Sequence, residues 1–241
     1  MNKIFSIYSF AHLSIALMEW VLLGGTIRLW RQSRSLPMIV LPIVLASISY
    51  DNLILSIGSL IGEGELLETL SMVRFLLHYV VVPLFIVIGV EIAHRAGAGW
   101  ANAAVRVLSW VIALGIAGVD VTTHYIGLDL VPVRFADILR YTVANVSGPP
   151  ITTIVVNLFM LLIGIGIWIR LKWPWLFVGT VVALIGNAIP SSLVGTLAGS
   201  GSEFVMAISL LLTERQTQFV STQIALDDKQ LEADALRAFE G

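Results

Sequence analysis

Long apolar runs separated by short polar connections dominate the pattern of this chain. A helix that crosses a bilayer needs about 20 mostly apolar residues, and seven runs approach or exceed that length. The sequence therefore predicts an all-α fold, a polytopic transmembrane bundle of about seven helices. The predicted spans cover residues 5–28, 37–61, 66–93, 103–127, 151–169, 174–197 and 201–220.

The charges between these runs predict how the bundle is oriented. Three connections are basic, whereas the connection around residues 62–65 carries only acidic charge. Because cytoplasmic connections carry an excess of Arg and Lys, we expect the basic connections in the cytoplasm. The N-terminus is then outside and the C-terminus is cytoplasmic. The basic groups are Arg28, Arg31 and Arg34, then His94, Arg95 and Arg106, then Arg170 and Lys172.

Two segments interrupt the apolar pattern. Asn187, Pro190 and the Gly-Ser run at 199–202 predict either a kinked sixth helix followed by a short seventh, or a broken helix. The segment 128–150 mixes acidic and basic residues, and we expect it to form a short interfacial helix on the outer side, with Arg134, Asp137 and Arg140 in water and Pro149-Pro150 at its end.

The chain divides into two predicted regions. Residues 1–214 form the transmembrane bundle, and residues 215–241 form a cytoplasmic amphipathic tail, because the chain turns polar after Glu214 while leucines recur among its acids. This tail is a candidate docking element for a protein partner.

Composition supports a multi-pass protein of the cell membrane, surrounded by membrane lipids. Hydrophobic residues make up 57% of the 241 residues and charged residues 12%, about half the charged fraction of soluble domains. The net charge of -2 offers no basic surface for nucleic acid, so nucleic-acid binding is excluded. Cysteine is absent, which excludes disulfides and thiolate chemistry.

Ionisable side chains occur inside the predicted spans, where each costs about 2.5–3.5 kcal/mol near the bilayer centre. Asp51 and Arg74 lie at overlapping depths in the second and third spans, so an ion pair between them is the first contact we expect. Arg74 and His78 share one helix face, as do Asp120 and His124. Together these groups predict a polar chamber open to the outer leaflet. The candidate catalytic residues are Asp51, Arg74, His78, Asp120, His124 and Glu203.

Two ionisable residues of the first span lie outside this list. Glu19 has no partner in its own helix except the distant Arg28, so it needs a polar neighbour from another span or must be protonated. His12 lies in the outer half of the same helix and can approach the chamber.

Each feature also has a structural interpretation. An Asp51–Arg74 pair can fix helix register without chemistry, and His78 and His124 can simply bond across helices. The four-residue spacing of Asp120 and His124 can hold a metal ion from one helix, and in a hydrolytic enzyme His78 would join them to hold a metal that activates water, but the sequence assigns no cofactor.

Three functions remain open. The first is an intramembrane enzyme that acts on a lipid or isoprenoid by acid–base chemistry. The second is a small transporter or proton-coupled carrier, favoured by the Gly, Ser, Asn and Pro residues of 187–202. The third is a non-catalytic scaffold that binds a partner through the C-terminal helix. A retinal photoreceptor is excluded, because Lys3, Lys172 and Lys229 are the only lysines and none lies in the last span.

Overall fold

The computed structural model describes residues 7–35, 37–144 and 150–240 of the chain. Residues 5 and 6 of the first predicted span, Pro149 and residue 241 lie outside the described residues. The elements follow one another as α1 (Ile7–Ser33), η1 (Pro37–Ile39), α2 (Val40–Ile61), α3 (Glu65–Val81), η2 (Val82–Leu84), α4 (Phe85–Arg95), α5 (Ala103–Asp120), η3 (Val121–Tyr125), β1 (Leu130–Phe135), β2 (Ile138–Val143), α6 (Ile151–Leu171), α7 (Trp175–Ala188), α8 (Ser191–Val194) and α9 (Leu197–Glu240).

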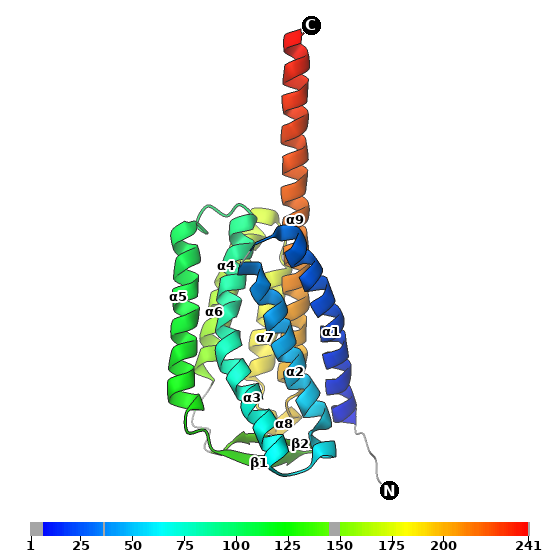
Figure 1. Ribbon diagram of the computed structural model, residues 1–241, viewed down its shortest axis with the longest axis vertical. Helices are drawn as coiled ribbons and strands as arrows, with labels where there is room; N and C mark the ends of the chain where they lie inside the picture. The colour runs from blue at the N-terminus through cyan, green and yellow to red at the C-terminus, as the bar shows by residue number, and fades with distance from the viewer. Residues whose placement is uncertain (1–6, 36, 145–149, 241) are drawn as a thin grey trace.

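The helices stand side by side in one bundle, which confirms the predicted fold class (Figure 1). The two strands lie at one end, which we call the hairpin end, and α1 also begins there. At the opposite end, the tail end, α9 leaves the bundle and projects alone.

Within the described residues, five helical segments are long and apolar enough to cross a membrane. The chain is therefore a multi-pass membrane protein. The five are α1, α2, Glu65–Arg95, Ala103–Tyr125 and α6, while α7 is a shorter apolar helix. The segment Glu65–Arg95 is interrupted by the 3-10 turn η2, because Pro83 has no amide hydrogen with which to continue the α-helical bonding of α3.

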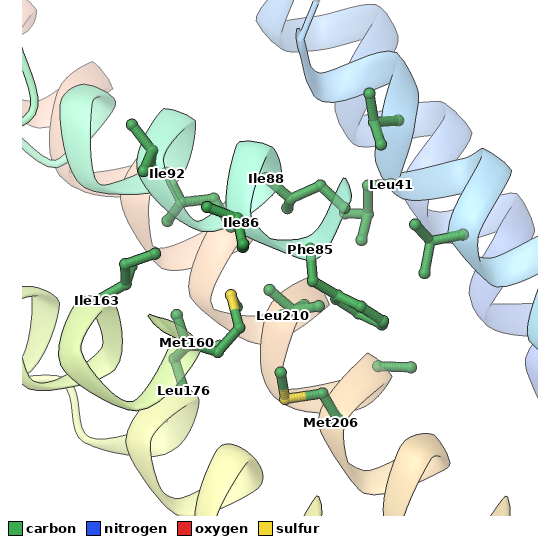
Figure 2. Packing of buried hydrophobic residues seen from close by; sticks show 14 of the residues in the cluster. Leu41, Phe85, Ile86, Ile88, Ile92, Met160, Ile163, Leu176, Met206 and Leu210 are labelled. Carbon is green, nitrogen blue, oxygen red and sulfur yellow. The ribbon is translucent and has the colours of Figure 1, made fainter. Parts of the chain in front are cut away.

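The helix α4 forms the centre of the hydrophobic core. All residues from Phe85 to Ala93 are buried, and all of them except Glu91 are apolar. Figure 2 shows Ile86, Ile88 and Ile92 of α4 among side chains from other helices. These neighbours include Leu41 of α2, Met160 and Ile163 of α6, Leu176 of α7, and Met206 and Leu210 of α9.

Small residues allow α6, α7 and α9 to pack closely. A Cβ atom at Gly164 of α6 would lie 2.9 Å from the backbone of Phe177 in α7. At Gly179 and Gly186 of α7, an added Cβ would overlap Ser209 and Ser202 of α9. Such close approach is the usual basis of helix association in membranes, where van der Waals contact replaces the hydrophobic effect.

The prediction of an interfacial helix at 128–150 is wrong, because β1 and β2 form an antiparallel hairpin there. Leu130 pairs with Val143 and Phe135 with Ile138, and Ala136 adopts a left-handed conformation in the two-residue turn. The strands are rich in β-branched and aromatic residues, which favour strands over helices. The charges scattered among these residues concealed that pattern.

The hairpin is fixed to the end of α2. Ser59 Oγ donates to the carbonyl oxygen of Asp137 and accepts from the amide of Leu139. Gly58 leaves room for the Leu139 carbonyl, which any Cβ would overlap. On the other side, the amide of Gly64 donates to the Tyr141 hydroxyl over 3.1 Å. The hairpin therefore covers the ends of α2 and α3.

The interrupted segment at 187–202 is a broken helix, one of the two predicted alternatives. The helix α7 ends at Ala188, Pro190 precedes the single turn α8, and Gly195 with φ 66° separates α8 from α9. From Leu197, α9 then continues without a break to Glu240, through the predicted boundary at residue 214.

Candidate functional site

One face of α3 is buried in the bundle and carries two polar residues. Its buried residues Leu67, Ser71, Arg74 and Val81 are spaced by three, four or seven residues, so they lie above one another on the helix. Leu67 joins a small apolar cluster with hairpin residues. Ser71 and Arg74 therefore lie just inside the layer that closes the hairpin end.

The predicted ion pair between Asp51 and Arg74 is present. Arg74 Nε donates to Asp51 Oδ1 over 2.7 Å, which joins α3 to α2. The Arg74 side chain is 8% exposed and that of Asp51 is 32% exposed. Arg74 Nη1 and Ser71 Oγ are buried and have no hydrogen-bond partner among the described residues. The pair therefore uses only part of the donor capacity of this cluster.

Arg140 of β2 adds a second guanidinium group, although we expected this residue in water. It is half-buried and interacts electrostatically with both Arg74 and Asp51. Burial lowers the pKa of Arg140, the neighbouring Arg74 lowers it further, and Asp51 opposes both effects. Within the described part of the chain, Arg140 forms no hydrogen bond or ion pair. Sequence reasoning missed Arg140, because its role depends on the hairpin.

His78 and Glu203 complete this neighbourhood. His78 lies one turn beyond Arg74 on α3, is half-buried, and interacts electrostatically with Asp51 and Arg74. Glu203 of α9, also half-buried, has the same two electrostatic partners. We call these residues the Arg74 cluster: the Asp51–Arg74 ion pair with Ser71, and the three groups that interact with the pair electrostatically, His78, Glu203 and Arg140. The cluster includes four of the six candidate residues, from three helices.

A second network lies beside this cluster and connects α1 to α2. His12 and Glu19 are fully buried, seven residues apart on one face of α1. Asn52 Nδ2 donates to both Glu19 carboxyl oxygens over 3.2 Å, so Asn52 is the polar neighbour that Glu19 required. The amide oxygen of Asn52 faces His12 Nδ1 at 2.8 Å, and Thr196 Oγ1 faces His12 Nε2 at 3.0 Å. No sequence signal identified Thr196, which lies 184 residues from His12.

The remaining two candidates, Asp120 and His124, form a separate group. Thr152 Oγ1 of α6 donates to Asp120 Oδ1 over 2.8 Å, and His124 Nδ1 lies 3.3 Å from the same oxygen. The His124 side chain is 59% exposed and its ring lies 6.1 Å from that of Tyr79. His78 connects the two groups only through electrostatic interaction with Asp120.

The metal hypothesis gains no third ligand. Among the described residues, no group of three or more His, Asp or Glu side chains is arranged to hold a metal ion. The chemistry available in the Arg74 cluster is instead that of proton transfer and anion binding, because it combines carboxyl, imidazole and guanidinium groups.

Comparisons with known proteins assign the chain to no family. No family model matches it, and no curated protein matches it.

Proposed function

We propose that this protein is an intramembrane enzyme that performs acid–base chemistry on a lipid-soluble substrate at the Arg74 cluster. One observation carries this proposal: two carboxyl groups, an imidazole and a guanidinium from α2, α3 and α9 share one electrostatic neighbourhood within the bundle. Helix packing does not require such a combination, and each ionisable group raises the free energy of placing its helix in the membrane.

The roles follow from the surroundings of each group. Asp51 is held in position by its ion pair with Arg74, and its side chain is 32% exposed, so a substrate can reach it. Glu203 has no ion pair among the described residues and is therefore the better proton donor. His78 can take up or return a proton, and Arg74 stabilises negative charge that develops on the substrate.

The basic residues support an orientation with the hairpin end outside. Arg31, Arg95, Arg106 and Arg170 lie where α1 ends, α4 ends, α5 begins and α6 ends, which is the tail end of the bundle in each case. By the positive-inside rule this end faces the cytoplasm. The substrate then enters from the outer leaflet of the cell membrane.

Lipid mass spectrometry tests the proposal. Cells that lack the protein are compared with cells that express the native chain, Asp51→Asn, or the control Asp137→Asn, which makes the same chemical change at an exposed position in the hairpin turn. We expect one lipid or isoprenoid to disappear, and its precursor to accumulate, both without the protein and with Asp51→Asn. A normal profile with Asp51→Asn, at equal protein abundance, rejects the enzyme.

A second function, a membrane scaffold or signal transducer, is favoured by the continuity of α9. This helix begins next to Thr196, carries Glu203, and extends 44 residues without a break. Its C-terminal part exposes the apolar residues Phe219, Ile224 and Leu231, which suit a protein partner. Truncation after Asp227 removes Leu231 and the rest of the tail, so it would weaken partner capture yet leave the lipid profile unchanged if this function is the correct one.

The remaining function, a small transporter or proton-coupled carrier, is not supported by the position of the broken helix. The break between α7 and α9 lies at the hairpin end of the bundle (Figure 1). Carriers place broken helices near the middle of the membrane, where the free helix ends bind substrate. We therefore do not propose transport.

A further inference from the structure

The Arg74 cluster has hydrogen-bond donors that nothing in the described chain uses. Arg74 Nη1 and Ser71 Oγ are buried one turn apart on the same face of α3, and neither has a hydrogen-bond partner in the part of the chain that the structure describes. Buried polar groups in folded proteins are nearly always paired. Two unpaired donors side by side therefore indicate a group with acceptor oxygens.

The charges of the cluster indicate that this group is an anion. Arg74 and Arg140 both interact with the single carboxylate of Asp51, and that carboxylate bonds to Arg74 Nε. Glu203 on α9 and His12 on α1 face the same groups, but neither forms an ion pair within the described residues. A guanidinium group binds carboxylate or phosphate in a fork of two parallel hydrogen bonds, and two guanidinium groups still have free donors here.

The position of the cluster favours the headgroup of an amphiphile over a free anion. Arg140 lies in the hairpin at the end of the bundle, whereas Arg74 and Ser71 lie deeper on a membrane-spanning segment. A headgroup held between them would sit at the depth of the lipid headgroups, and its alkyl chain would extend along the apolar helices.

We propose that Ser71, Arg74 and Arg140 form a binding site for an anionic headgroup, a carboxylate or phosphate, of a single-chain or double-chain amphiphile. This inference rests on the proposed function, because it names the substrate class of the same site. It adds that recognition is by negative charge and that Arg140 of the hairpin takes part.

Equilibrium binding to the purified full-length chain in nanodiscs of zwitterionic phospholipid tests the site. The probes are dodecyl phosphate, dodecanol and inorganic phosphate, and dodecanoate replaces the phosphate in a second series. We expect dodecyl phosphate to bind about tenfold more tightly than dodecanol, the ratio that one charge-assisted hydrogen bond provides. If inorganic phosphate displaces bound dodecyl phosphate at a similar concentration, the site recognises a free anion. If only another amphiphile displaces it, the site recognises a lipid headgroup.

Variants of the hairpin make the test specific. Arg140→Gln should abolish the preference for the phosphate, and Arg140→Lys should retain most of it. Arg134→Gln is the matched control, since Arg134 lies in the same hairpin but is 60% exposed and 3.7 Å from Glu63. Equal binding of dodecanol and dodecyl phosphate, or equal losses in Arg140→Gln and Arg134→Gln, would overturn the site. A charge preference without any lipid change in cells would reject the enzyme and leave the site standing.

Discussion

The two ends of the bundle both hold buried charges, but each buried carboxylate at the tail end is paired with an arginine, whereas the hairpin end holds buried donors without an acceptor among the described residues. At the tail end, Glu91 accepts from Ser35 Oγ at 2.5 Å and from Arg106 Nε at 2.9 Å. Glu214 of α9 pairs with Arg95 of α4 and accepts from Gln218 at 2.6 Å. Three of these contacts join separate segments of the chain, and the bond from Gln218 supports the Glu214–Arg95 pair from within α9. These charges therefore have a structural role.

At the hairpin end, the buried donors Arg74 Nη1 and Ser71 Oγ have no acceptor among the described residues, and the buried acceptor Asp120 Oδ2 has no donor. Asp51 is the only described ion-pair partner of Arg74, and Arg140 has none. One acceptor at the tail end, Glu214 Oε2, is also unpaired, but its carboxylate already accepts two donors through the other oxygen. The comparison teaches that buried charge alone does not distinguish the two ends, whereas buried donors without acceptors do, and these donors are the basis of the proposed site.

The largest expected effect is at the tail end. Arg95→Met leaves the fully buried Glu214 without its cation, and breaking such a pair costs about 3–5 kcal/mol. We expect this loss in the free energy of unfolding, measured by titration from mild detergent into dodecyl sulfate. Arg215→Met, at an exposed neighbouring position, is the control and should change it by less than about 0.5 kcal/mol.

The double variant Arg95→Met with Glu214→Leu sharpens this test. Replacing both charges by apolar groups removes the uncompensated carboxylate, so most of the lost stability should return. If the double variant has the same free energy of unfolding as Arg95→Met alone, the Arg95–Glu214 ion pair does not account for the loss.

At the hairpin end the same kind of change should cost less. Arg74→Leu leaves Asp51 at a position where water reaches a third of its side chain, so we expect a loss of about 2 kcal/mol in the same titration. The charge swap Asp51→Arg with Arg74→Asp should recover part of it. A neutral effect of Asp51→Lys would show that the ion pair does not stabilise the fold.

The attachment of the hairpin gives the next effect. Gly58→Ala places a Cβ against the Leu139 carbonyl, and overpacking of this kind costs about 1–2 kcal/mol. Hydrogen exchange at the Leu139 amide, which donates to Ser59, should become faster. Gly24→Ala is the control, because nothing lies within 4 Å of its added Cβ, and unchanged exchange in both variants would contradict the docking.

The sequence predicted the features that depend on neighbouring helices. The Asp51–Arg74 contact followed from a short connection between two spans and from overlapping depths along them, which residue counts alone determine. Glu19 was recognised as needing a partner, because an isolated acid in a span requires one. Asn52 could be identified as that partner only from the rotation of α1 against α2, which a single sequence does not specify.

The hairpin and its consequences escaped prediction for a different reason. Charged residues within the hairpin suggested a solvated helix, whereas Arg140 lies in a paired strand and interacts electrostatically with Arg74 and Asp51. Thr196 reaches His12 only because α7 breaks at Pro190 and the chain turns back at Gly195. Both depend on contacts between distant segments, which hydrophobic periodicity does not encode.

The smallest expected effect separates the Asp120 group from the Arg74 cluster. Thr152→Val removes the 2.8 Å bond to Asp120 Oδ1 but leaves His124 beside that oxygen, so we expect a loss of about 1 kcal/mol in the unfolding titration. Thr122→Val is the control, since its exposed hydroxyl bonds only to its own helix. If the two groups act independently, Thr152→Val leaves the binding of dodecyl phosphate unchanged. A matching fall in that binding would show instead that Asp120 acts through His78 on the Arg74 cluster, and the site would then extend across α3 to α5.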